Sequence, residues 1–536
     1  MTDACFTYSS RASYAHVLCT VSSAVDAFSS TPLPIFDSDH GSVVFTNNIS
    51  GDITYTAAAG TFTFAKAGTY HVVLTLVSSQ ETSDQLQTIT FELNSDGIIY
   101  TAAPFIDFAM DPTETTHQRI ISVAEGDVLN IDGSTGGHTM GIVKGTSVVI
   151  TEITSGVYAS STVTTAGSNN TTAQFNPFDT DGAGPAFAST AKIASGVVFD
   201  ETDASWKIPS SGKYLIMVNN LYAAGGATSN TNTIRLYRNN GSYDVTSADD
   251  ILFSNAVKIH STVDPTEHTI CVIEDLNADD YLAVTYDVGA GRVHAEVGAT
   301  FTVIKLQEGQ PIGGTGRGIG GYGNIYASVM SDQDSASGSS EINPFDEANL
   351  VGDKTFTTRA ISGIAFSPAE GTFTVDKPGL YFIMHNPIFQ VAGNVVVTTK
   401  ILVNGVIVSA SDTAFINNAV EDPMNLTNTA FVELQKNDVV TVLSDANTAV
   451  NLAHKAGSHI TMFRYYGFFG SLDTTAAVDG LISDDFTIDT FSQGNLSAQY
   501  DRNIAQVPFK LGVRGAGTLR GRCTQPSVTK LGDKKN

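Results

Sequence analysis

The amino-acid sequence predicts an all-β protein built from three tandem antiparallel β-sandwich domains. One unusual spacing occurs three times: an aromatic residue, then glycine six positions later, then tyrosine two positions after the glycine. Runs of alternating β-branched, aromatic and polar residues follow each copy, which is typical of half-buried strands. No stretch shows the longer period of an amphipathic helix, and Gly, Asn and Asp separate the short apolar runs, as in other all-β folds.

The repeated motif supplies nine residues that we expect to anchor the three cores. Aromatic side chains on either side of a turn can face the same sheet interior, and a glycine between them permits a tight backbone path. Their expected role is structural, without contact to a ligand. The predicted anchors are Phe62, Gly68 and Tyr70 in the first copy, Trp206, Gly212 and Tyr214 in the second, and Phe373, Gly379 and Tyr381 in the third.

Two further landmarks keep the three copies in register. Each copy opens on a proline with an aromatic residue one or two positions later, in Pro34-Ile35-Phe36, Asn176-Pro177-Phe178 and Asn343-Pro344-Phe345, which suits chain entry at a sheet edge. Each copy also has an aspartate 16 residues after an Asp-Pro pair, in a polar turn between two strands. These aspartates are Asp127, Asp280 and Asp438.

The repeats divide the chain into seven predicted segments. Ser/Thr-rich and Gly-rich stretches between the copies have the composition of flexible linkers, and neither end repeats the domain motif. We expect an N-terminal arm at 1–30, sandwich domains at 31–154, 174–307 and 341–467, linkers at 155–173 and 308–340, and a C-terminal extension with a basic, Gly-rich tail at 468–536.

The combined pattern resembles the signature of the tumour-necrosis-factor and complement C-one-q globular-head superfamily. The likeness is carried by Tyr55, Gly60, Phe62, Gly68, Tyr70 and Asp127 in the first copy and by Phe366, Gly371, Phe373, Gly379, Tyr381 and Asp438 in the third. The second copy departs from it at Ala204 and Trp206. The resemblance implies three TNF-like jelly rolls and a tendency to associate about a threefold axis. It carries over no catalytic motif, so the fold alone does not decide the function.

Charge is strongly biased along the chain. The protein has 54 acidic and 28 basic residues, a formal net charge of −26, which argues against nucleic acid or an anionic membrane as partner of the body. The last 36 residues instead carry a local excess of positive charge. We expect this tail either to be a solubilising end or to tether the protein to an acidic neighbour. The candidate tether residues are Lys510, Arg514, Arg520, Arg522, Lys530, Lys534 and Lys535.

The sequence offers no pattern for catalysis, a cofactor or a metal. Four scattered cysteines fit free thiols better than a disulfide framework. Nucleophile elbows and phosphate-binding loops are absent from the sequence. The segment Asp179-Thr180-Asp181-Gly182 begins like a calcium loop but has Thr190 at the twelfth position, so a solvated turn is expected. The first thirty residues do not resemble a secretory signal.

These observations favour a non-enzymatic structural protein of a virus particle. Such a minor capsid, decoration or spike subunit would be assembled in the host cytoplasm beside other virion proteins. Three jelly rolls could close on each other as a single-chain pseudo-trimer, or three chains could stack as a homotrimer. The alternative is a fibre head that binds a host receptor or glycan, for which exposed Asn, Asp and Tyr in the turns would serve.

Overall fold

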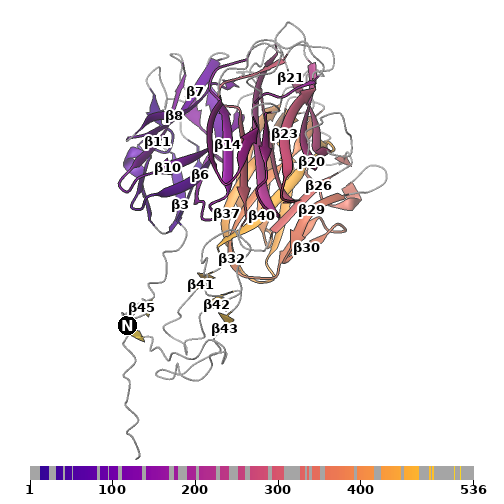
Figure 1. The fold of residues 1–536 in the computed structure, drawn as a ribbon. Helices are drawn as coiled ribbons and strands as arrows, with labels where there is room; N and C mark the ends of the chain where they lie inside the picture. Colours follow the sequence, from indigo (N-terminus) through magenta and orange to yellow (C-terminus); the bar gives the residue numbers. More distant parts are fainter. Residues whose placement is uncertain are drawn as a thin grey trace, which may run out of the picture.

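In the computed structural model, the described residues run from 13 to 466 with gaps, followed by five two-residue strands (Figure 1). The gaps are 23–31, 40–42, 51, 81–84, 95, 107–111, 136–139, 168–173, 179–189, 201–203, 225–229, 241–250, 260–265, 288–292, 307–325, 332–334, 337–340, 350–355, 392–394, 416–423 and 448–451. Beyond 466 the described strands are β41 Phe468–Phe469, β42 Ile482–Ser483, β43 Phe486–Thr487, β44 Gly512–Val513 and β45 Leu519–Arg520.

The fold is nearly all β, with three jelly rolls at 13–153, 157–306 and 326–466, each built on two main antiparallel sheets. We name the sheet that faces the other jelly rolls the inner sheet and the other the outer sheet. The helical segments among the described residues are short 3-10 turns, Ala57–Ala59 and Glu347–Asn349. None of the described helical turns has the length and apolar character needed to cross a membrane.

In the first jelly roll the inner sheet has the order β10-β6-β13-β1-β3 and the outer sheet the order β4-β5-β11-β7-β8. The inner strands are β10 Thr113–Val123, β6 Gly68–Gln80, β13 Ser147–Glu152, β1 Tyr14–Val21 and β3 Val44–Ser50, with β12 Met140–Ile142 beside β6. The outer strands are β4 Ile53–Thr56, β5 Thr61–Phe64, β11 Val128–Thr135, β7 Gln85–Leu93 and β8 Gly97–Ala102, with β2 Leu33–Pro34 and β9 Phe105–Ile106 at their margins.

The second jelly roll repeats this topology, with the inner order β16-β14-β25-β19-β22 and the outer order β17-β18-β23-β20-β21. The inner strands are β16 Thr190–Ser195, β14 Tyr158–Val163, β25 Thr300–Lys305, β19 Gly212–Ala224 and β22 Thr266–Leu276, with β24 Val293–Ala295 beside β19. The outer strands are β17 Val198–Asp200, β18 Ser205–Lys207, β23 Asp280–Asp287, β20 Asn230–Asn240 and β21 Ile251–Ile259, with β15 Gln174–Phe175 beside β23.

The third jelly roll repeats it again but has an additional four-stranded sheet beside the inner one. The inner strands are β29 Phe356–Ser362, β26 Tyr326–Ser331, β40 His459–Tyr466, β32 Gly379–Asn386 and β37 Asn428–Leu434. The outer strands are β30 Ile364–Ser367, β31 Thr372–Val375, β38 Val439–Ala446, β34 Val395–Val403 and β35 Val406–Phe415, with β28 Glu341–Ile342 beside β38. The additional sheet has β27 Ser335–Ala336, β39 Leu452–His454, β33 Ile388–Val391 and β36 Met424–Asn425.

The aromatic anchors of the repeated motif lie inside the individual sandwiches. All six are fully buried: Phe62, Tyr70, Trp206, Tyr214, Phe373 and Tyr381. Each anchor tyrosine turns its hydroxyl back to the carbonyl oxygen four residues earlier, at 3.4 Å for Tyr70 and at 2.7 Å for both Tyr214 and Tyr381. The motif therefore encodes a corner in which a buried tyrosine ties the strand start to the preceding turn.

The repeated aspartates fix the turn that leads into β11, β23 and β38, the equivalent outer-sheet strands of the three jelly rolls. In all three copies the aspartate carboxylate accepts a hydrogen bond at 2.7 Å from the N–H three residues earlier. The residue before each aspartate has a positive φ: 89° at Gly126, 69° at Asp279 and 70° at Asn437. Since Gly, Asn and Asp tolerate this conformation best, one turn geometry explains three different residues at this position.

The domain boundaries differ from the sequence-based expectation at three places. The expected N-terminal arm contains β1, the expected linker at 155–173 contains β14, and the expected linker at 308–340 contains β26. Each of these strands lies second from one edge of its inner sheet, hydrogen-bonded to the last long strand of the same jelly roll. The Ser- and Thr-rich composition of β14 resembles a linker, but two of its hydroxyl groups are paired across the sheet: Ser160 with Thr302 at 3.0 Å and Thr162 with Thr300 at 3.4 Å.

Candidate functional site: the interface among the three jelly rolls

The three jelly rolls pack together as a closed ring. β10, the edge strand of the first inner sheet, lies against β14, β19 and β25 of the second. β22 of the second lies in the same way against β26, β32 and β40 of the third. On β37 of the third, Phe431 meets Tyr14 of the first, with ring centroids 5.1 Å apart. At each of the three interfaces, an edge strand of one inner sheet therefore packs against the inner sheet of the next jelly roll. The third jelly roll contacts the first in this way (Figure 1).

One apolar cluster runs through all three inner sheets. The three edge strands contribute Ile120, Ile273 and Phe431 to it. Their positions are equivalent, because each pairs in register with the residue that follows an anchor tyrosine: His71, Leu215 or Phe382. The cluster is separate from the cores inside the sandwiches. Burial of this apolar surface stabilises the ring, since removing apolar area from water contributes about 25 cal/mol per Å².

A glycine turn before the last strand of each jelly roll permits close approach of a neighbour. Gly145, Gly298 and Gly457 have positive φ values of 101°, 101° and 96°. A Cβ on Gly145 would lie 2.7 Å from Ser411 Cα of the third jelly roll. A Cβ on Gly298 would lie 2.9 Å from Ala102 Cα of the first. These two turns thus admit the neighbouring strands β35 and β8 only because they have no side chain.

Three side chains at equivalent positions each accept a hydrogen bond from the neighbouring jelly roll, and the direction around the ring is the same at all three interfaces. Each stands two residues before a threonine on its own chain segment: Glu114, Glu267 and Asn425. The Thr116 N–H of the first jelly roll donates to both carboxyl oxygens of Glu267 at 2.6 Å. The Thr269 N–H of the second donates to Asn425 Oδ1 at 3.0 Å.

The third of these contacts completes the ring between the last jelly roll and the first. The Thr427 N–H of the third jelly roll donates to Glu114 Oε1, and Ser411 Oγ donates to Glu114 Oε2 at 2.9 Å. We call Glu114, Glu267 and Asn425 the acceptor ring. Each member satisfies a backbone N–H of a different neighbour, so all three interfaces use one hydrogen-bonding scheme.

Burial changes the protonation of the two acids in the acceptor ring. It raises the pKa of Glu114 to about 8, although the hydrogen bonds from Ser411 and Thr427 act in the opposite direction. Burial also raises the pKa of Glu267 well above its ordinary value, and the charge of Glu114 adds to this effect. Burial therefore acts against the charged form of both carboxyl groups, whereas the N–H and O–H donors on their oxygens act in favour of it.

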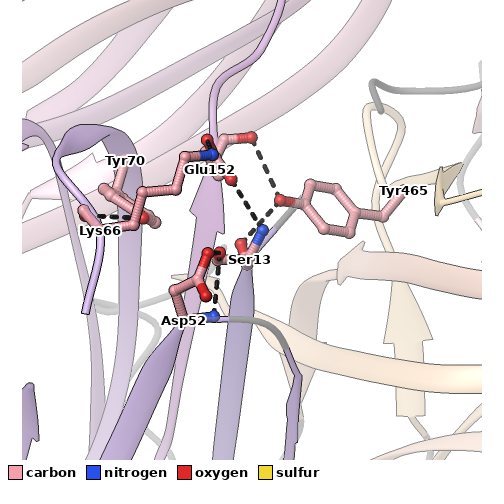
Figure 2. Close-up of polar contacts among 6 residues, drawn as sticks. All are labelled: Ser13, Asp52, Lys66, Tyr70, Glu152 and Tyr465. Atoms are coloured by element: carbon pink, nitrogen blue, oxygen red, sulfur yellow. Dashed lines mark hydrogen bonds and ion pairs between the residues drawn. The ribbon is translucent and has the colours of Figure 1, made fainter. Parts of the chain in front are cut away.

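A second polar contact joins the beginning of β1 to the end of β40 (Figure 2). The Tyr465 hydroxyl lies 2.9 Å from the carbonyl oxygen of Ser13 and 3.1 Å from that of Glu152. The Ser13 N–H donates to Glu152 Oε2 at 2.9 Å, and Lys66 pairs with Glu152 Oε1 at 2.6 Å. Asp52 N–H donates to Ser13 Oγ at 3.1 Å. We call this group the terminal clasp.

The clasp brings the two ends of the described body to one place. Ser13 is the first described residue and Tyr465 the second-last residue of the third jelly roll. The residues 1–12 and 467–536 consequently attach to the body at adjacent points. Of the candidate tether residues, Arg520 lies in β45, and Lys510, Arg514, Arg522, Lys530, Lys534 and Lys535 lie outside the described residues.

The interface residues were not singled out by the sequence, although two signals point to them. Tyr-Ala opens β1, β14 and β26, at Tyr14, Tyr158 and Tyr326, in segments that we expected to be an arm and linkers. A glycine also stands two residues before the last long strand of each copy. The predicted core anchors lie within single jelly rolls instead, and none of the nine is a member of the apolar cluster between them.

The described residues contain no group of three or more His, Cys, Asp and Glu side chains that could hold a metal ion. The Asp179-Thr180-Asp181-Gly182 segment lies outside the description. Cys19 and Cys271 are buried free thiols, and burial raises the pKa of each to about 12. A serine–histidine contact exists between Ser458 Oγ and His454 Nδ1 at 3.4 Å, but both side chains are fully buried away from any substrate.

Comparison with known proteins gives weak likenesses only. No protein-family model and no curated protein sequence matches the chain. Among solved structures, an Eiger TNF of S. frugiperda is 18% identical with a TM-score of 0.20, and the match covers 29% of this chain and 96% of that one.

Two further solved structures share more of the length. The triple jelly-roll structure of the turret assembly in an archaeal virus is 9% identical with a TM-score of 0.17, covering 83% of this chain and 91% of that one. A chain of Sulfolobus turreted icosahedral virus is 10% identical with a TM-score of 0.16, covering 78% and 87%. Identities and TM-scores this low carry no conclusion about function. What stands is the fold: three jelly rolls of nearly pure β structure, joined in one ring.

Proposed function

We propose that this chain is a non-enzymatic structural subunit of a virus particle, in which three jelly rolls act as one preassembled pseudo-trimer. The observation that carries the proposal is the acceptor ring together with the closed edge-to-face packing. A single chain thereby supplies the three interfaces that a trimer of separate subunits would need to form. The partners of such a subunit are other capsid or virion proteins, and its location is the virion.

The chemistry of the described residues supports a structural role. Polar side chains at the interfaces accept hydrogen bonds from backbone N–H groups of neighbouring jelly rolls, as Glu267 does from Thr116. The serine–histidine pair Ser458 and His454 is buried, and a catalytic pair must reach its substrate. We therefore assign the geometry that is repeated in the three copies to assembly and not to catalysis.

The terminal clasp supports attachment of the body at one end. Because Tyr465 and Ser13 are in hydrogen-bond contact, the residues before 13 and after 466 leave from one place. The seven candidate tether residues follow this point, while the body is acidic. Two segments that leave from one place can fix the orientation of a rigid body on an underlying acidic surface.

Two measurements test the proposal. Analytical ultracentrifugation of the purified full chain should give a monomer of 56.5 kDa, because the ring is closed within the chain. A trimer as the smallest species would contradict the pseudo-trimer. Electron microscopy of the source particle should then place the chain among the shell proteins with the terminal clasp directed inward.

Removal of the tail tests the tether separately. A chain ending at Pro508 should keep the circular dichroism spectrum of the full chain but enter particles at reduced occupancy. Replacing the seven tether residues by glutamine is the matched variant, since it keeps the length. Normal occupancy of both variants would refute the tether. A protein absent from particles that binds host cells would instead support the receptor-binding alternative.

A further inference from the structure

The chain crosses from one jelly roll to the next twice, and both crossings start and end at equivalent positions. Ile153 and Leu306 follow the last long strands of the first and second jelly rolls. The N–H of each donates at 2.8 Å to the carbonyl oxygen of the residue before the anchor tyrosine. Tyr158 and Tyr326 then begin β14 and β26, which pair with the last long strands of their own jelly rolls.

The two crossings differ greatly in length. The first consists of the 4 residues 154–157, and the second consists of the 19 residues 307–325. The second jelly roll lies on the first as the third lies on the second, because one edge-to-face packing and one acceptor scheme recur at both interfaces. Four residues therefore suffice for either crossing, and the second connector is 15 residues longer than the ring requires.

The short first connector holds the first two jelly rolls together as a pair. Gly156 O accepts a hydrogen bond from Ser195 Oγ at 2.8 Å. Val157 O accepts one from the Lys305 N–H at 2.9 Å. The connector is thus bound along the second jelly roll, and the two domains cannot separate far.

The third jelly roll forms two of the three interfaces of the ring. Towards the second jelly roll, His459 Nε2 accepts a hydrogen bond from the Cys271 N–H at 3.1 Å. Towards the first, the hydroxyl oxygens of Thr429 and Thr75 lie 3.3 Å apart. These contacts join the described strands of the jelly rolls and do not depend on whether both partners belong to one chain.

We propose that copies of this chain exchange their third jelly rolls, so that the third jelly roll of one copy completes the ring of the first two jelly rolls of another. The partner at this surface is a second copy of the chain. The inference rests on the pseudo-trimer of the proposed function and adds a contact between subunits. Because the same contacts form within a chain and between chains, the exchange alters only the chain connectivity and costs no interface.

The length of the second connector matches this exchange. An extended chain spans about 3.3 to 3.6 Å per residue, so the second connector reaches up to about 65 Å and the first only about 15 Å. The long strand β6 alone, with 13 residues, is about 43 Å long at about 3.3 Å per residue. Only the longer connector can therefore reach from one ring to another that lies beside it.

The connector also sets the concentration at which exchange occurs. A linker of this kind holds its own domain at an effective concentration on the order of mM. Dilute chains consequently close their own rings. Copies that are packed side by side in an assembly reach comparable local concentrations, and there exchange competes with closure within the chain.

Exchange would carry the terminal clasp to the neighbouring copy. Tyr465 of one chain would then bind the carbonyl oxygen of Ser13 in the other, as it does within one chain at 2.9 Å. Residues 467–536, with the candidate tether, would start from the neighbour. Each copy would thus be joined to the next by a covalent connector and a complete domain.

The experiment places one cysteine on each of two full-length chains that carry different affinity tags. Thr75→Cys in one chain and Thr429→Cys in the other can form a disulfide only if the third jelly roll of the second chain lies on the first jelly roll of its partner. After co-expression and oxidation, purification through both tags should recover the disulfide-linked pair. Cys5→Ser and Cys523→Ser in both chains remove two other cysteines. The remaining native cysteines, Cys19 and Cys271, are buried.

The matched control shortens the second connector to the length of the first by deleting residues 309–323. With Thr75→Cys and Thr429→Cys in one molecule, the shortened chain should still form the disulfide inside its own ring. Recovery of the linked pair should fall about tenfold or more, because the connector no longer reaches a neighbour.

Three results of this comparison would overturn the proposal. The first is that no linked pair is recovered from full-length chains. The second is equal recovery from full-length and shortened chains, which would show that the length of the connector is irrelevant. The third is a shortened chain that folds but cannot form its internal disulfide, since the 15 residues would then be needed to close the ring itself.

Sedimentation of the wild-type chain covers the case in which the cysteine or shortened variants do not fold. The dilute chain should be a monomer, and a species of twice its mass should appear as the protein is concentrated. The shortened chain, where it folds, should remain a monomer. A wild-type chain that stays monomeric at every concentration refutes the exchange and leaves the pseudo-trimer intact. A trimer as the smallest species refutes the pseudo-trimer, and a dimer of both chains assigns the contact to another surface and refutes the exchange.

Discussion

A single glycine decides how closely two jelly rolls can approach. Gly298 combines a φ of 101° with direct contact to Ala102 of the first jelly roll, whereas Gly156 has a φ of 67° and nothing within 4 Å of a Cβ built on it. Gly156→Ala adds backbone strain alone, which costs about 1–2 kcal/mol. Gly298→Ala adds overpacking at the interface and should cost about 1–3 kcal/mol more.

Urea denaturation of the two alanine variants measures this difference. Gly298→Ala should also increase the radius of gyration under native conditions, because the first and second jelly rolls must move apart. Equal losses of unfolding free energy in the two variants would show that strain, and not the neighbouring domain, requires the glycine.

The three corner tyrosines offer a second comparison at the residue scale. Tyr214 and Tyr381 donate to their carbonyl oxygens at 2.7 Å, but Tyr70 does so at 3.4 Å, beyond the usual range. Tyr214→Phe should therefore cost about 1 kcal/mol of unfolding free energy, as is typical for one hydrogen bond. Tyr70→Phe should cost less. Thermal melting of the two variants at one pH checks this order, and a larger loss of stability in Tyr70→Phe would contradict it.

At the scale of single elements, the edge strand β37 holds the contact between the third and the first jelly roll. Phe431 on β37 contacts Tyr14 at 5.1 Å, Tyr465 at 5.4 Å and His16 at 6.3 Å between ring centroids. Phe431→Ala should cost about 3–5 kcal/mol, the usual loss for a buried phenylalanine. Because two of these partners belong to the first jelly roll, the ring should open at this interface.

The control for β37 is Phe373→Ala, which removes a buried ring from the core of the third jelly roll itself. This variant should melt earlier while keeping the scattering profile of wild type below its transition. Phe431→Ala should change the scattering profile before the circular dichroism is lost. Identical scattering of Phe431→Ala and wild-type protein would indicate that the interface does not depend on this strand.

The elements also mark the limit of what the sequence could predict. The spacing of Phe373, Gly379 and Tyr381 identifies the domain because these residues interact locally, across one corner. β14 was missed because two of its hydroxyl side chains, Ser160 and Thr162, are paired with threonines of β25, about 140 residues away in sequence. The acceptor ring could not be predicted either, since its geometry depends on how three domains pack and not on any local pattern.

For the whole molecule, buried histidines predict sensitivity to acid. Burial lowers the pKa of His16 and His71 to about 4 and that of His454 to about 3. A base with a lowered pKa stabilises the fold above its unfolded value of about 6.5, and this contribution is lost as the pH falls toward the folded value. The melting temperature should therefore fall between pH 6.5 and pH 4.

His385 offers a direct test of this acid sensitivity. Burial and the neighbouring His454 and His459 hold its pKa well below the ordinary range, and within the described residues neither ring nitrogen has a hydrogen-bond partner. His385→Leu should keep the stability at pH 7 and lose less melting temperature at pH 4. His294→Leu, at a half-buried histidine bonded to Glu296, is the control and should not flatten the acid side. Parallel acid profiles of His385→Leu and wild type would contradict the prediction.

The terminal clasp has a kinetic consequence for synthesis. Tyr465 lies at the end of the third jelly roll and Ser13 at the beginning of the first, so their contact cannot form until nearly the whole body has left the ribosome. The first two jelly rolls can dock while the third is still being made. Because every partner is on the same polypeptide, ring closure is a first-order event whose rate does not depend on protein concentration. A cell that makes few copies would assemble each one as readily as a cell that makes many.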